Sequence, residues 1–268
     1  VMYQELRAVE DEPAQKVMLE LRRRHYPDPW GRPSQGDAAS LKAISLDDIR
    51  NHFQRAYRPT GTIVGVAGRF DWESLQDHVG SLLGDWQPAE RAELAESHHP
   101  APYQHLSYDS NQTQIGVAYA SVPYRSEDYF PAWGAVGILS GGMSARLFTE
   151  VRERRGLCYS VYATHHTLPH LGGVFCYAGT SAERAQETLD VLLAELQRLG
   201  EGVEEHELER LKARIKSALI MQQESSSARS GSIARDWHHL GRARTLAELD
   251  ALVDALTSER INAYLAAN

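Results

Sequence analysis

The sequence predicts an α+β fold, and three features of the 268-residue chain support that prediction. Strand-like segments follow one another within residues 105–121 and 158–179, and amphipathic helical stretches fill most of the remaining second half. Consecutive strands with grouped helices are typical of a mostly antiparallel sheet with helices packed on one face. A capped helix also recurs late in each half, which indicates two homologous domains.

The N-terminal part is predicted to be helical on either side of a loop. Apolar residues recur at three- and four-residue steps over residues 2–21, and Pro13 predicts a kink or two abutting helices. Residues 27–36 are rich in Pro and Gly and predict an ordered loop. Ser45, with Asp48 three residues later, forms a shortened capping box that starts another helix.

A strand–helix unit and a linker follow. Thr62–Ala67 predicts a strand, and Asp71 caps the next helix. The following stretch contains three prolines and no periodicity, which is typical of an interdomain linker. We therefore expect domains at 1–86 and 104–268, joined by the linker 87–103.

The second domain begins with strands and continues mainly as helices. The predicted strands are His105–Tyr108, Gln112–Ser121, Cys158–Thr167 and Gly173–Gly179, the last two as a hairpin. The predicted helices are Glu127–Leu139, Ser144–Arg155, Ala182–Leu199, Val203–Gln223, a segment after Ser227, Leu246–Leu256 and Ser258–Ala267.

An internal repeat supports the two-domain prediction. Ser45–Tyr57 and Ser258–Leu265 are both capped amphipathic helices placed late in their domains. The first copy leads into the predicted strand Thr62–Ala67, whereas the second is followed by the end of the chain at Asn268. The pattern is that of a duplicated fold with an incomplete first domain, trimmed at both ends.

Composition excludes several classes of partner. The net charge of −8 argues against nucleic acid, which attracts clustered positive charge. No apolar run approaches the roughly 18 residues of a membrane span. The two cysteines cannot form a disulfide framework, and the sequence starting at Val1 carries no signal-peptide pattern. The compartment is left open.

The histidines do not form a complete metal motif. Neither His-x-x-Glu-His nor His-Glu-x-x-His occurs among the twelve histidines. His165, His166 and His170 lie close together, but neighbouring strand residues point to opposite faces and no carboxylate is near them in sequence. We therefore expect no complete metal centre within this chain.

Glu5 has two interpretations. It lies at the edge of the apolar helical stripe, where a carboxylate needs a cation, a donor or a metal as partner. Alternatively, it is a partly exposed first-turn glutamate that interacts favourably with the helix dipole. Periodicity alone favours the second interpretation.

Arg152 and Tyr159 also allow two interpretations. An arginine in a last helical turn complements the helix dipole, and a strand tyrosine is often half-buried packing. In the other interpretation, a guanidinium and a phenol together hold a peptide carbonyl. The residues alone favour the first interpretation. The nearby Gly141–Ser144 segment is either an anion site or a tight turn between helices.

The order of several motifs resembles the pitrilysin/insulinase-type zinc metallopeptidases, which include mitochondrial processing peptidase. Gly141–Val161 (GGMSARLFTEVRERRGLCYSV) resembles the family's second, metal-free domain most closely. Further matching segments are Val1–Leu6, Glu10–Pro13, Trp30–Gly36, Val64–Gly68, Tyr177–Thr180 and Glu204–Ser226. The resemblance covers nearly the whole chain in the family's order.

The resemblance implies a clamshell of two α+β domains around an unfolded peptide. In the family, an inverted His-x-x-Glu-His motif and a distant glutamate hold zinc, and zinc-activated water attacks the scissile carbonyl with the motif glutamate as base. The distant glutamate corresponds to Glu5. The family's Arg-x6-Tyr pair, which holds the substrate backbone and helps to stabilise the oxyanion, corresponds to Arg152 and Tyr159.

The chain departs from the family because only four residues precede Glu5, whereas the zinc motif lies several dozen residues before the third ligand. We therefore expect the complete protein to bind zinc. This chain alone is expected to contain no catalytic residue, to bind no catalytic zinc and to cleave no peptide. The alternative is a non-catalytic peptide-binding or scaffold subunit. A binding domain unrelated to proteolysis agrees with composition but not with the motifs. The expected partners are peptide substrates and a related subunit in a homo- or heterodimer.

Overall fold

The computed structural model describes residues 2–88, 94–97 and 103–268, which group into two compact units. Within the described residues, unit 1 comprises 2–35, 96–97, 103–217 and 246–268, and unit 2 comprises 36–88, 94–95 and 218–245. These units do not coincide with the expected domains 1–86 and 104–268. That division by homology stays a prediction, and its linker, 87–103, lies partly outside the described residues.

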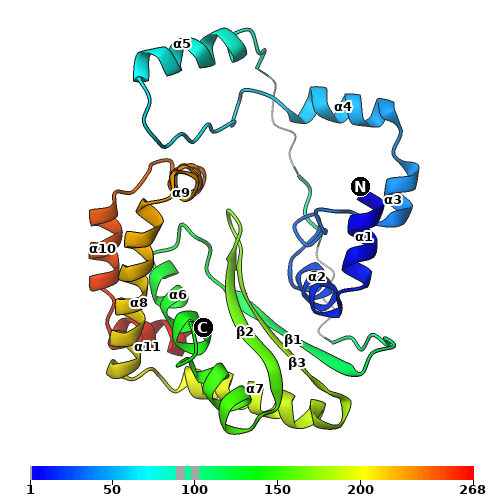
Figure 1. Ribbon diagram of the computed structural model, residues 1–268, viewed down its shortest axis with the longest axis vertical. Coiled ribbons are helices and arrows are strands. Elements are labelled where there is room, and N and C mark those ends of the chain that lie inside the picture. Colours follow the sequence, from blue (N-terminus) through cyan, green and yellow to red (C-terminus); the bar gives the residue numbers. More distant parts are fainter. Residues whose placement is uncertain (1, 89–93, 98–102) are drawn as a thin grey trace. The chain divides into compact units, whose positions relative to one another are not determined.

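Unit 1 contains the sheet and most of the helices (Figure 1). Its elements are α1 (Met2–Glu10), α2 (Pro13–His25), β1 (Gln112–Ser121), α6 (Tyr129–Ser140), the π-helical turn η1 (Phe148–Arg154), β2 (Cys158–Thr167), β3 (Gly172–Ser181), the 3-10 turn η2 (Ala182–Arg184), α7 (Ala185–Gly200), α10 (Leu246–Asp254) and α11 (Ser258–Ala267). The long helix α8 (Glu205–Gln223) begins in unit 1 and ends in unit 2.

Unit 2 is helical in its described residues. Its elements are α3 (Ala38–Ala43), α4 (Leu46–Ala56), α5 (Trp72–Leu83), the end of α8, and α9 (Ser226–Leu240). The Ser45–Asp48 capping box is confirmed at the start of α4, and the Asp71 side chain caps α5 by accepting from the Ser74 backbone N–H at 2.9 Å.

The sheet of unit 1 is antiparallel, with strand order β1–β3–β2. The predicted β2–β3 hairpin is confirmed, and Cys176 in the central strand pairs with Val117 on one side and Ala163 on the other. β3 is the central strand and is hydrogen-bonded to β1 on one edge and to β2 on the other. It is buried from Gly172 through Thr180. The α+β prediction is therefore confirmed.

The core of unit 1 lies between the sheet and α6. This helix is apolar nearly all round, and Leu139 and Ala132 are no more than 1% exposed. Val174 of β3 approaches Ala132 and Tyr264 of α11 around a small cavity of about 30 Å³. Burial of α6, α11 and one sheet face against each other therefore anchors the segments that follow α6.

Helix α2 packs on the opposite face of the sheet. Pro13 is its first residue and separates it from α1, which confirms two abutting helices. At its other end, His25 meets the Phe175 ring edge-on with centroids 5.1 Å apart, and the Tyr26 hydroxyl hydrogen-bonds His166 Nδ1 at 3.0 Å. The sheet is thus covered on both faces.

Two predicted strands are wrong. Thr62–Ala67, predicted from its apolar run, and His105–Tyr108, predicted from its alternation, are not strands, because a strand also needs a hydrogen-bonded neighbour. Over 62–67 the backbone runs against α9 instead: a Cβ on Gly65 would lie 2.7 Å from the Ser230 carbonyl oxygen. Among the described residues, unit 2 contains no strand with which residues 62–67 could pair.

No helix in the described part of the chain combines the length and the apolar character required to span a bilayer.

Candidate peptide-binding site

Arg152 lies on a turn whose geometry the sequence did not predict. The expected α-helix Ser144–Arg155 is π-helical over Phe148–Arg154, a rare form that often occurs at functional sites. Val151 is fully buried and anchors the turn beneath, while Gly156, at φ +56°, ends it in the left-handed region. The turn therefore holds Arg152 at the surface on a buried base.

The guanidinium of Arg152 contacts two aromatic rings. Its Cζ is 4.8 Å from the ring centroid of Phe148 and 4.8 Å from that of Tyr159. No hydrogen bond or ion pair engages this guanidinium anywhere in the part of the chain that the structure describes. A cation–π contact does not use the N–H groups of a guanidinium as hydrogen-bond donors to a carbonyl, so they stay available to a ligand.

Tyr159 reaches Arg152 because β2 has a bulge at this point. Cys158 pairs with Thr180 and Ser160 pairs with Gly179, so Tyr159 is the extra residue without a partner in β3. A bulge re-aims a side chain relative to the regular strand alternation. The ring is 82% exposed, and within the described residues its hydroxyl makes no hydrogen bond.

Glu150 pairs with the other two arginines of the turn. Its carboxylate accepts from Arg154 at 2.5 Å and from Arg155 at 2.7 Å, and its side chain is only 8% exposed. Burial raises the pKa of Glu150, but the Arg155 hydrogen bond and the charges of both arginines outweigh it and leave the pKa below its ordinary value. Glu150 is therefore ionised at neutral pH.

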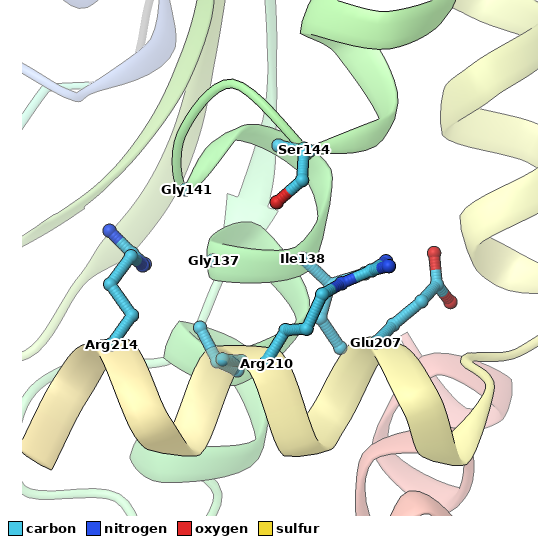
Figure 2. Close-up of a pocket in the computed structure, with 9 residues that line it drawn as sticks. Gly137, Ile138, Gly141, Ser144, Glu207, Arg210 and Arg214 are labelled. Carbon is cyan, nitrogen blue, oxygen red and sulfur yellow. The ribbon is translucent and has the colours of Figure 1, made fainter.

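The turn between α6 and η1 is anchored to α8. Arg146, buried just before the π-helical stretch, makes two hydrogen bonds to the Glu207 carboxylate, at 2.7 and 2.6 Å. Figure 2 shows Arg210 and Arg214 rising from α8 toward this turn, around a cavity of about 40 Å³. Gly142 adopts φ +145° here, as a tight turn between helices requires.

Glu5 is exposed and stands apart from this site. No residue of α1 is buried, and no hydrogen bond or ion pair links Glu5 to Arg152, Tyr159 or any other described residue. Catalytic zinc is held by three protein ligands. Across the described ranges no group of three His, Cys, Asp or Glu side chains could hold a metal, so the residues present do not fit zinc.

The histidines of β2 serve the packing of the sheet. His165 Nε2 lies 3.1 Å from the Ser121 hydroxyl, and His166 interacts with Tyr26. Burial lowers the pKa of both histidines, so both are neutral and hydrogen-bonded at neutral pH. His170 is exposed at the β2–β3 turn and belongs to no metal-binding group.

Sequence reasoning paired Arg152 with Tyr159, and the structure brings these two side chains together. It missed Glu150 and the role of Phe148 as the second ring. The four-residue spacings Phe148–Arg152 and Glu150–Arg154 could have indicated both contacts, because side chains four positions apart meet on one helix face. The bulge at Tyr159 has no comparable sequence pattern.

Comparisons with known proteins agree with this architecture. The family model described as the peptidase M16 inactive domain matches residues 43–215. Among curated proteins, an uncharacterized zinc protease of Bacillus subtilis is 28% identical over 271 residues, covering 98% of this chain and 64% of its own length. One of Mycobacterium tuberculosis is 29% identical over 243 residues, covering 88% and 55%. The chain thus spans less than two thirds of these relatives.

Solved structures share the fold. A peptidase M16 inactive domain from Pseudomonas fluorescens has a TM-score of 0.81 at 23% identity, covering 98% of this chain and 64% of that one. A chain of complex III2 from Candida albicans has a TM-score of 0.81 at 19% identity, covering 99% and 66%. Because the family model covers most of the sequence, the chain belongs to the peptidase M16 inactive-domain family.

Proposed function

We propose that this chain is the peptide-binding part of a zinc-dependent metalloendopeptidase that cleaves unfolded peptides or presequences. The observation that carries the proposal is the Arg152 guanidinium, which contacts two rings and makes no hydrogen bond to any described residue, beside the exposed side chain of Tyr159. Both groups donate hydrogen bonds, and both can reach a ligand from solvent. Family membership supports the proteolytic context.

The proposed role of the pair is to hold a backbone carbonyl of the peptide. A guanidinium N–H donates a charge-assisted hydrogen bond, and the phenol O–H donates a second to the same oxygen. Both bonds strengthen as negative charge develops on that oxygen during attack on the carbonyl carbon. Arg152 and Tyr159 would then bind the ground state and stabilise the oxyanion, without exchanging a proton with it.

We place zinc in the complete protein. Relatives named zinc proteases support this placement, and Glu5 is our proposed ligand from this chain. One carboxylate does not retain zinc, so the chain alone is expected to bind peptide without cutting it. Measuring zinc content and cleavage on the purified chain tests this part, and stoichiometric zinc with chelator-sensitive cleavage would contradict it.

Fluorescence anisotropy of a labelled, unfolded peptide tests the binding role. Arg152→Ala should weaken the affinity about tenfold, because a charge-assisted hydrogen bond is lost. Arg125→Ala is the matched control: it removes the same charge from an exposed arginine that has no partner within the described residues. Equal affinities for the two variants would refute the role of Arg152.

The alternative function is a non-catalytic peptide-binding or scaffold subunit. The fold similarity to a chain of a large assembly, complex III2, is the observation that favours it. The coding sequence upstream of Val1 discriminates between the two functions: a His-x-x-Glu-His motif there supports the peptidase, and a long upstream region without it supports the scaffold.

A further inference from the structure

The surroundings of Arg152 separate it from the other cations of its turn. Three arginines, at positions 152, 154 and 155, lie within four residues, and a single buried carboxylate lies among them. Glu150 binds Arg154 and Arg155, and the Arg155 guanidinium also donates to the Glu150 carbonyl at 2.9 Å. The Glu150 carboxylate is therefore engaged by these two arginines, and Arg152 forms no ion pair with it.

The same contacts fix the backbone that carries Arg152. Glu150 precedes Arg152 by two residues and its two partners follow it, so the ion pairs tie the end of the turn to its middle. Arg184 supports that end from outside by donating to the carbonyls of Gly156 and Arg155 at 2.8 and 3.0 Å. With Val151 fully buried beneath, the backbone at 152 is held on several sides.

The two rings beside Arg152 differ in how firmly they are held. Tyr159 is 82% exposed and sits at a bulge, whereas Phe148 is partly buried and follows the fully buried Leu147. Phe148 is therefore the firmer of the two walls. A guanidinium stacked on a fixed ring loses less orientational freedom when its edge forms hydrogen bonds.

We propose that Phe148 and Glu150 are positioning residues for peptide binding. Phe148 restricts the Arg152 guanidinium through their cation–π contact, and Glu150 holds Arg154 and Arg155 in ion pairs, so that Arg152 is the arginine of this turn whose charge no carboxylate of the described residues pairs. Neither residue touches the peptide. This inference rests on the proposed function, but the positioning itself is present in the free chain.

Side-chain NMR of the Arg152 Nε–Hε group, combined with peptide anisotropy, tests the role of Phe148. In the unmodified chain the resonance, assigned by its loss in Arg152→Lys, should be shifted upfield by the rings. Phe148→Leu should remove about half of that shift, because Tyr159 remains, and should weaken peptide binding about fivefold, the scale of one exposed cation–π contact. Phe148→Tyr, which keeps a ring, should restore both readouts.

Glu150→Gln tests the proposed positioning role of Glu150, and Glu153→Gln is a matched control on the same turn. Glu153 is exposed and has no partner in the part of the chain the structure describes. Glu150→Gln should broaden or move the Arg152 resonance and weaken binding, and Glu153→Gln should do neither. Thermal melts of every variant separate positioning from unfolding: a lower melting temperature with an unchanged Arg152 resonance contradicts positioning.

The outcomes distinguish this inference from the proposed function. An unchanged resonance and affinity in both Phe148→Leu and Glu150→Gln, with Arg152→Ala still impaired, would overturn the inference alone. If Arg152→Ala binds peptide normally, the proposed function fails, whatever the resonance shows.

Discussion

The two units bury their helices to very different extents. In unit 1, seven residues of α6 are buried, and Leu139 is completely so. In unit 2, α4 and α5 have no buried residue, and Phe53 and Leu82 are 59% and 68% exposed. Local features therefore account for the helices of unit 2: a capping box starts α4, and the Asp71 side chain starts α5.

The difference shows why the candidate site lies where it does. A side chain binds tightly only when its support is rigid, and rigidity comes from packing beneath it. The turn bearing Arg152 rests on fully buried Val151 and Leu147. Nothing comparable supports the apolar side chains of α4 among the described residues. We therefore expect the two units to have separate stabilities, set by buried side chains in unit 1 and by local contacts in unit 2.

The largest expected effect is in unit 2, where one ion pair is buried. Arg244 donates to Asp236, with side-chain exposures of 6% and 3%. Asp236→Ala removes the buried carboxylate that accepts from the Arg244 guanidinium and should cost about 3–5 kcal/mol, measured by denaturation with hydrogen exchange at α9. Asp47→Ala, which breaks the exposed pair with Arg50, should cost less than about 1 kcal/mol. Similar costs for both variants would contradict the comparison.

Removing core volume from α6 should have the next largest effect. Leu139→Ala creates a cavity at a completely buried position and should lower the free energy of unfolding by about 3 kcal/mol in urea denaturation. Leu82→Ala, the same change at an exposed position of α5, should cost under about 0.5 kcal/mol. Equal costs would show that α6 does not anchor unit 1.

Acidification should weaken the packing of α2 on the sheet to a smaller degree. Burial lowers the pKa of His25 and of His166, and Arg22 lowers that of His166 further. The unfolded chain therefore binds more protons, so stability is full above about pH 6.5 and falls as pH drops through that value toward the lower folded pKa. Melting temperatures between pH 7.5 and 5.5 measure this slope.

Variants locate the source of that pH dependence. His166→Gln should reduce the slope, because it removes one of the histidines whose pKa burial lowers. A slope that survives His166→Gln in full would exclude His166 as a source.

The smallest expected effect is on the apolar face of α4. Phe53→Ser should change the unfolding free energy by less than about 0.5 kcal/mol, because its ring is exposed and, among the described residues, stacks on Tyr57 alone. Binding of a hydrophobic dye should decrease in the same variant, since exposed apolar patches bind such dyes. A loss of several kcal/mol would show that α4 packs against more than the structure describes.

Sequence patterns correctly predicted the features that depend on neighbouring residues, such as helix boundaries, caps and the hairpin. Pro13 separated two helices, Ser45 and Asp48 formed their capping box, and the β2–β3 hairpin formed where alternation predicted it. The failed strand Thr62–Ala67 shows the limit, because its residues favour an extended chain while pairing depends on a distant neighbour. The same limit applies to the candidate site, where residue identities could be predicted and their geometry could not.

For the site, the sequence supplied Arg152 and Tyr159 through resemblance to a family, but not their geometry. Their contact depends on a π-helical turn and on a bulge, each of which shifts a side chain by one position relative to regular structure. Such irregularities arise from tertiary packing around Val151 and β3. Periodicity therefore could not predict them.

A double-mutant cycle on peptide affinity tests the central claim most directly. The account predicts that Arg152 and Tyr159 hold the same carbonyl oxygen, so Arg152→Ala and Tyr159→Phe together should cost about 1 kcal/mol less than the sum of the two single variants. Additive losses within about 0.3 kcal/mol, or no loss in either single variant, would contradict it.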